Sequence, residues 1–166
     1  NFLIFEDRKF SDIGKIFLEQ LNGGIYNISS WADIITIHGI TCEGMLNILT
    51  DKSPKVLIVS QMSSTGNLIT NEYTNKCYSI ACKYKDKVLG FISQTKFINT
   101  KDFLFLTPGV KIVSNTNKTE KDQNYRTPYK AIYEDGNDKI IVGSGLYNIK
   151  NNLDFNKNIE KYKNIY

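Results

Sequence analysis

The sequence is poor in the residues that bind metal ions or crosslink small folds. Among 166 residues there is one histidine, His38, and three cysteines, an odd number with no two at C-x-x-C spacing. Zinc sites draw several ligands from cysteine and histidine, and disulfide frameworks use paired cysteines. The sequence therefore argues against a zinc site and favours three free thiols in a reducing cytoplasm.

Long apolar runs and basic runs are also missing. No apolar segment is long enough to cross a membrane, and no signal-peptide pattern is present. The net charge is +4, and the lysines are scattered among acidic residues rather than clustered. We therefore expect neither a membrane nor a nucleic-acid partner, whereas a phosphorylated small molecule would suit a locally positive site.

Short runs rich in β-branched and aromatic residues recur along the chain. They lie at 2–5, 33–38, 55–60, 88–93, 103–107 and 139–143. Most are apolar on both faces rather than alternating, which is typical of strands in a parallel sheet.

Segments with helical periodicity lie between most of these runs. Asp12 is the expected cap of a helix carrying Ile13, Ile16, Phe17 and Leu21, which Gly23 and Gly24 end. Further helices are expected at 43–49, 71–84, from Thr127-Pro128 and from about 151 to the end.

This rhythm predicts one α/β domain over residues 1–166 with a parallel sheet. About six strand–helix units are present, whereas a (β/α)₈ barrel has eight. The chain begins at Asn1, one residue before an expected strand. If the fold is a barrel, we expect its first two strands upstream of this segment.

One stretch, FEDRKFSDIG at residues 5–14, sets charges of both signs directly after an apolar run. In a strand, Asp7 and Lys9 would project to the same side, and Asp12 follows where the chain leaves the strand. At the carboxyl end of a barrel strand these groups would face an active-site mouth, with the carboxylate keeping the lysine protonated. On spacing alone, a salt-bridged strand end explains the pattern equally well.

The stretch closely resembles the D-x-K-x-x-D signature of the orotidine 5′-monophosphate decarboxylase family, in the type fused at the C-terminus of eukaryotic UMP synthase. The resemblance continues in the family's order over nearly the whole chain, through GGIYNISSWADIITIHG, QMSSTGNL, GFIS, LTPGV, the QNY turn and IIVGSGL. It implies a (β/α)₈ TIM barrel, of which this chain holds about six units.

The resemblance also implies a reaction, the conversion of orotidine monophosphate to UMP without metal or organic cofactor. Lys9 would protonate the C6 carbanion left when carbon dioxide departs. Asp7 would lie against the substrate carboxylate. Asp12 would reach the neighbouring subunit's site, which implies a homodimer.

Substrate-binding residues are implied in the same way. Ser63 would read the uracil edge, and Pro108 would line the pyrimidine pocket. The residues matched to the phosphate are Gln123, Tyr125 and Gly143, and the polar stretch 111–123 resembles a closing loop. Without the family context, Ser63 and Ser64 would cap a short helix, and Pro108 would be a turn proline.

Three features depart from the family pattern. The family's first catalytic lysine and its substrate-binding aspartate lie on strands upstream of this segment. Ser144 stands where the family has an arginine on the phosphate, and Ile16 where it has a ribose-binding threonine. Cations from the loop could compensate for Ser144, the candidates being Lys118, Lys121 and Arg126. These departures leave open a second interpretation, a catalytically inactive nucleotide-binding or assembly protein.

Overall fold

The computed structural model describes residues 2–112, 119–120, 123–147 and 152–164, which fall into two compact units. The first unit comprises Asn1–Gln61, Leu68–Ile92 and Thr100–Phe103. The second comprises Met62–Asn67, Ser93–Asn99 and Leu104–Tyr166.

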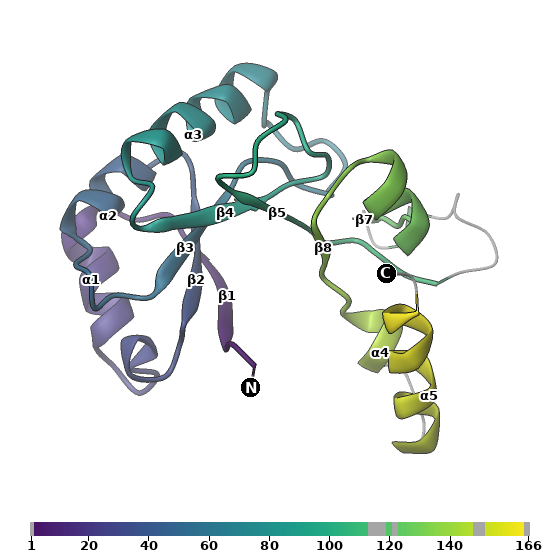
Figure 1. Cartoon of the computed structure of the whole chain (residues 1–166). Helices are drawn as coiled ribbons and strands as arrows, with labels where there is room; N and C mark the ends of the chain where they lie inside the picture. The colour runs from purple at the N-terminus through teal and green to yellow at the C-terminus, as the bar shows by residue number, and fades with distance from the viewer. Residues whose placement is uncertain (1, 113–118, 121–122, 148–151, 165–166) are drawn as a thin grey trace. The chain divides into compact units, whose positions relative to one another are not determined.

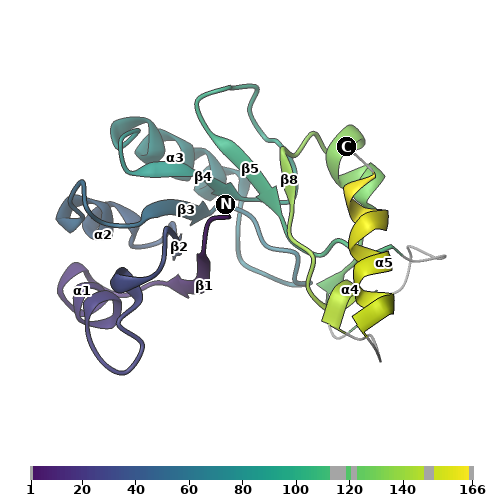
Figure 2. The same cartoon turned by 60° about the horizontal axis from the view of Figure 1, so that its bottom comes forward.

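The first unit contains a parallel sheet of four strands in the order β1 (Phe5–Phe10), β2 (Ile34–His38), β3 (Lys55–Val59) and β4 (Val88–Ile92). The intervening helices are α1 (Gly14–Asn22), α2 (Cys42–Ile48) and α3 (Asn71–Lys83), with a short 3₁₀ helix at Ile28–Ser30. The three α-helices lie on one side of this sheet (Figures 1 and 2). The expected alternation of strand and helix is confirmed.

The core of the first unit lies between the sheet and these helices. In β2 and β3 the central residues of both faces are buried, as expected for a parallel sheet. Each helix buries an apolar stripe, and Phe17 of α1 packs edge-on against Phe10 at 5.1 Å between ring centroids. The buried stripes comprise Phe17 and Leu21, Met45 and Leu46, and Cys77 and Ala81.

The first strand differs from the sequence-based expectation. A strand at 2–5 is wrong, because Phe2 and Leu3 are 87% and 68% exposed and pairing with β2 begins at Phe5. The four charged residues 6–9 are therefore part of the strand. Glu6 pairs with Ile35, but Phe10 pairs with Ile37. Strand β1 therefore has two extra residues between Glu6 and Phe10, which form a bulge.

The helix ends follow from local chemistry. Asp12 is not the cap of α1: Ile13 occupies that position, and the Asp12 carboxylate accepts a hydrogen bond from the Ile13 nitrogen at 2.8 Å. The expected end at Gly23-Gly24 is confirmed, with Gly24 at a φ of 64°. Thr127 caps a helical turn as expected, accepting from the Lys130 nitrogen at 3.2 Å before the π-helix Lys130–Glu134.

The second unit contains the parallel pair β5 (Leu104–Thr107) and β8 (Lys139–Ile140), both shorter than the sequence predicts. A small antiparallel hairpin, β6 (Thr119–Glu120) and β7 (Gln123–Asn124), overlaps the stretch 111–123 that is expected to be a loop. Residues 113–118 and 121–122 of that stretch are outside the described residues.

Two helices close the second unit, α4 (Ser144–Tyr147) and α5 (Asn152–Lys163), and they lie side by side in both views. In the part of the chain that the structure describes, no helix combines the length and apolar character needed to cross a membrane.

Candidate functional site

The bulge in β1 holds the first group of predicted site residues. Lys9 adopts a left-handed backbone conformation, with a φ of 58°. Its ammonium nitrogen lies 2.7 Å from Oδ2 of Asp7. The two side chains meet, as the sequence predicts, but the bulge and not regular strand alternation brings them together. A left-handed lysine is strained, and such strain concentrates at functional sites.

Thr36 fixes both members of this pair. Its side chain is fully buried in β2, and its hydroxyl accepts a hydrogen bond from the Lys9 backbone nitrogen at 2.8 Å. The same hydroxyl donates to Oδ1 of Asp7 at 3.2 Å. Sequence reasoning missed this residue. Its signal was a single polar side chain inside the apolar run Ile34-Ile35-Thr36-Ile37.

His38 ends β2 near the same pair. Burial lowers the pKa of its imidazole below the ordinary 6.5, and the positive charge of Lys9 lowers it further. His38 is therefore neutral at pH 7 and adds no second positive charge beside Lys9. Across the described ranges, no three His, Cys, Asp or Glu side chains gather as a metal site would require.

Asp12 and Ile16 lie beyond the bulge. Besides its bond from Ile13, the Asp12 carboxylate accepts from the Gln20 side chain at 3.5 Å. The Asp12 carboxylate is therefore held by Ile13 and Gln20 of the helix that follows it. Ile16 is half-buried on α1.

The second unit brings together three other predicted residues. The hydroxyl oxygens of Tyr125 and Ser144 are 3.2 Å apart, and Gly143 directly precedes Ser144. The Lys111 ammonium lies 5.1 Å from the centroid of the Tyr125 ring. These residues bring a cation and two hydroxyls to the turn at Gly143. Gln123 lies in β7, two residues before Tyr125. The Gln123 side chain, Lys118 and Lys121 fall outside the described part of the chain.

Ser63 and Pro108 occupy loops of the second unit. The interpretation of Ser63 and Ser64 as a helix cap is wrong, because residues 61–70 contain no helix. The Ser64 carbonyl instead accepts from the Asn67 side chain at 2.7 Å within a turn. Pro108 directly follows β5, before Gly109 at a φ of 75°.

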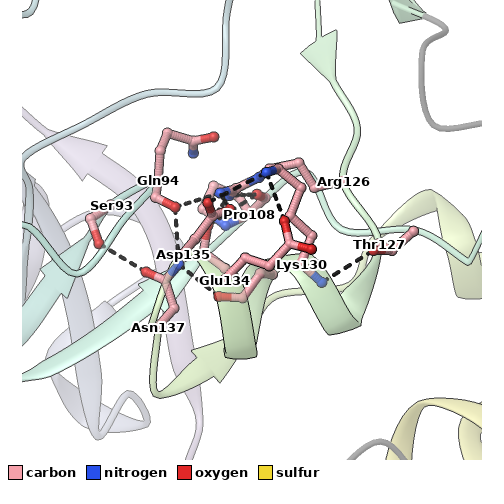
Figure 3. Close-up of polar contacts among 11 residues, drawn as sticks. Ser93, Gln94, Pro108, Arg126, Thr127, Lys130, Glu134, Asp135 and Asn137 are labelled. Atoms are coloured by element: carbon pink, nitrogen blue, oxygen red, sulfur yellow. Dashed lines mark hydrogen bonds and ion pairs between the residues drawn. The ribbon is translucent and has the colours of Figure 1, made fainter.

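Arg126 does not serve as a cation of the loop. Its guanidinium is mostly buried and pairs with Asp135 at 2.5 Å. It also donates to backbone carbonyls of Gln94 and Pro108 and to the Thr107 hydroxyl (Figure 3). Asn137 extends this network by donating to the same Gln94 carbonyl at 2.9 Å. The expectation that Arg126 compensates for Ser144 is therefore wrong, because the Arg126 guanidinium is paired with the Asp135 carboxylate.

Known proteins resemble the chain in sequence over most of its length. Residues 1–154 match the model of the orotidine 5′-phosphate decarboxylase / HUMPS family. The chain is 37% identical over 164 residues to uridine 5′-monophosphate synthase of Bos taurus, covering 96% of this chain and 34% of that protein. It is 42% identical over 157 residues to orotidine 5′-phosphate decarboxylase of Pachysolen tannophilus, covering 89% of this chain and 58% of that protein.

Solved structures show the same fold. The orotidine 5′-monophosphate decarboxylase of Methanocaldococcus jannaschii, solved with the inhibitor BMP, matches with a TM-score of 0.68 at 21% identity, over 98% of this chain and 73% of that one. The enzyme from Metallosphaera sedula matches with a TM-score of 0.65 at 16% identity, over 98% and 74%. The expected fold, part of an α/β TIM barrel, is confirmed. The chain belongs to the orotidine 5′-phosphate decarboxylase / HUMPS family and spans one third to three fifths of the length of these two related proteins.

Proposed function

We propose that this chain is part of an orotidine 5′-monophosphate decarboxylase, which forms UMP and carbon dioxide in de novo pyrimidine synthesis. The observation that carries the proposal is the Lys9 ammonium, held 2.7 Å from the Asp7 carboxylate on a strained bulge. Family membership and the names of the related proteins support the same activity.

The chemistry needs a proton donor at one carbon atom. When the bond between C6 and the carboxylate breaks, its electron pair stays on C6, and Lys9 delivers a proton there. Asp7 lies against the departing carboxylate and holds the Lys9 ammonium in place. Fixed charges of this kind need no reorganisation as the substrate's charge moves from the carboxylate to C6.

The substrate-binding residues supply orientation. Tyr125 and Ser144, with Gln123 and the Gly143 backbone, bind the phosphate. Ser63 contacts the uracil edge, and Pro108 lines the pyrimidine pocket. Binding energy from the phosphate, remote from C6, then serves to orient the ring for the reaction.

The assembly is part of the same proposal. Residues 1–166 belong to a single barrel domain, and Asp12 acts in the site of a second subunit, so the active form is a homodimer. We place the protein in the cytoplasm, in keeping with three cysteines that form no disulfide, Cys42, Cys77 and Cys82.

A second function is favoured by Ser144 and Ile16. Each replaces a substrate-binding side chain of the family pattern by one that is neutral or apolar. A protein that binds nucleotide, or only assembles, without turnover would keep the fold and lose these contacts.

The test is decarboxylation of orotidine monophosphate by the full-length protein that contains this chain. The Lys9→Ala variant is expected to lose at least a hundredfold in turnover, the usual scale for a general acid. Arg8→Ala is the matched control, because Arg8 is a neighbouring cation that pairs with Glu6 instead. A folded wild-type protein without turnover would support the inactive nucleotide-binding protein and reject the enzyme.

A further inference from the structure

Arg126 joins the segment that carries Tyr125 to the end of β5. It directly follows Tyr125 in sequence, and Nη2 of its guanidinium donates to the Thr107 hydroxyl and, at 3.5 Å, to the Pro108 carbonyl. Thr107 is the last residue of β5 and is fully buried. The side chain beside a proposed phosphate-binding residue is therefore bound to the strand end that leads into the proposed pyrimidine pocket.

We infer that Arg126 is a positioning residue for phosphate binding, because it fixes the segment of Tyr125 at the end of β5. This inference rests on the proposed function. It gives Arg126 a role that needs no contact with the substrate, since the Arg126 guanidinium is bound to the protein itself.

Strand β5 is a fixed support for this segment. It pairs with β8 through Thr107 and Ile140, and the Ile141 nitrogen donates to the Thr107 carbonyl at 2.8 Å. Ser144 follows β8 closely, and its hydroxyl oxygen lies 3.2 Å from that of Tyr125. The two hydroxyls proposed to bind the phosphate thus meet from segments attached to one pair of strands.

The backbone of Arg126 alone provides a weaker attachment. Its nitrogen donates to the Gly109 carbonyl at 2.9 Å, and its carbonyl accepts from the Lys111 nitrogen at 3.0 Å. Two neutral hydrogen bonds add little net stability, because water takes their place when the segments separate. Hydrogen bonds from a charged guanidinium are stronger, so the side chain of Arg126 makes the attachment firm.

The opposite side of the guanidinium is held as well. Nη1 donates to the Asp135 carboxylate and to the Gln94 carbonyl (Figure 3). The Arg126 and Asp135 side chains are only 13% and 14% exposed, so separating them would leave a largely buried carboxylate without its closest cation. Because the guanidinium is planar and rigid, holding Nη1 at Asp135 also directs Nη2 toward β5. A lysine has a single ammonium nitrogen and cannot reach the acceptors on both sides.

The experiment measures binding of UMP and of uridine to the full-length protein by calorimetry. Arg126→Lys keeps a cation for Asp135 and loses the second donor nitrogen. We expect it to weaken UMP binding roughly tenfold, whereas uridine, which lacks the phosphate, should bind as it does to the wild type. The matched control is Lys96→Gln, which breaks a partly buried ion pair of the same unit, with Asp138 at 2.9 Å, and should change neither affinity.

A double-mutant cycle on UMP binding separates positioning from general stability. Tyr125→Phe removes the hydroxyl and should weaken UMP binding in the wild type, but it should add little in Arg126→Lys, where that hydroxyl is already displaced. A variant that is only less stable would leave the two effects additive. Thr107→Val keeps the pair with Asp135 and removes the acceptor on β5. It should weaken UMP binding in the same direction, and it decides the question if Arg126→Lys does not fold.

The outcomes distinguish the inference from the proposed function. If the wild type binds UMP and both Arg126→Lys and Thr107→Val bind it equally well, the role of Arg126 is rejected and the proposed function stands. Equal weakening of UMP and uridine, equal weakening by Lys96→Gln, or additivity with Tyr125→Phe would also reject the role. A folded wild type that binds no UMP overturns both.

Discussion

The hydroxyl of Thr36 accepts a hydrogen bond from the backbone nitrogen of Lys9, 2.8 Å away, and donates to the Asp7 carboxylate at 3.2 Å. One buried side chain of β2 thus sets the position of both charged groups on β1. The sheet holds the bulge in a conformation that the chain alone would not favour.

Replacing Thr36 by valine keeps the shape of the side chain and removes the hydroxyl. We expect Thr36→Val to lower the free energy of unfolding by about 1–3 kcal/mol, because the Lys9 nitrogen loses its acceptor. Turnover should fall as well, since Asp7 and Lys9 lose their common anchor. Urea unfolding and steady-state kinetics measure the two effects. Thr36→Ser, which keeps the hydroxyl, should retain turnover; if serine and valine behave alike, the hydrogen bonds do not matter.

The conformation of Lys9 predicts a conflict between stability and activity. Glycine adopts a φ of 58° without the steric cost that a lysine or alanine bears. Lys9→Gly should therefore be more stable than Lys9→Ala by about 1 kcal/mol, although the proposed function predicts that both are inactive. The comparison isolates the backbone, because both variants lack the ammonium. Chemical unfolding checks it, and equal stability would show that the bulge is unstrained.

His38 predicts a specific dependence of stability on pH. Its pKa is lowered in the folded protein, first by burial and then by Lys9, so below pH 6.5 the unfolded state binds more protons. The contribution of His38 to stability is therefore complete above pH 6.5 and is lost as the pH falls toward the folded-state pKa. Unfolding free energies at pH 7.5 and 5.5 should differ less in His38→Gln than in the wild type. Identical pH dependence in the two proteins would contradict this assignment.

The buried network around Arg126 should matter for stability. Arg126→Gln leaves the Asp135 carboxylate without its closest cation, and breaking a largely buried pair costs about 3–5 kcal/mol. Lys163→Gln removes an exposed cation that pairs with the Glu160 carboxylate and should cost less than about 1 kcal/mol. Thermal or urea unfolding of the two variants tests the contrast. Similar losses for both would mean that the buried Arg126–Asp135 pair contributes no more to stability than an exposed ion pair.

Gly145 and Tyr162 should behave as a coupled pair. A Cβ at position 145 would overlap the Tyr162 hydroxyl oxygen, while the ring carbon behind it would lie 3.4 Å away. Gly145→Ala should thus be destabilising in the wild type and much less so in Tyr162→Phe. A double-mutant cycle of unfolding free energies measures the coupling, and strict additivity would contradict it.

The parts of the fold that the sequence predicts are those governed by local rules. The strands near 33–38, 55–60 and 88–93 were predictable because their residues are apolar on both faces, which only burial on both sides explains. Thr127-Pro128 was predictable because capping depends on adjacent residues.

The misplaced features depend on partners far away in the chain. The start of β1 is set by its pairing with Ile34 and not by the hydrophobicity of Phe2 and Leu3. Nothing in the sequence around Arg126 reveals that its guanidinium pairs with the Asp135 carboxylate and donates to the Gln94 carbonyl. The contact between Asp7 and Lys9 was predicted from strand alternation, although a bulge produces it.

The bulge in β1 also separates the residues that pair with the neighbouring strand from the residues that would carry out the reaction. The ladder between β1 and β2 passes through Phe5, Glu6 and Phe10, while Asp7, Arg8 and Lys9 lie in the interval where the register shifts. Lys9 contacts Thr36 through its backbone nitrogen, which any residue except proline provides. Point substitutions of the Lys9 side chain can therefore change or erase a reaction while strand pairing persists. A scaffold built in this way can acquire new chemistry over generations without having to refold first.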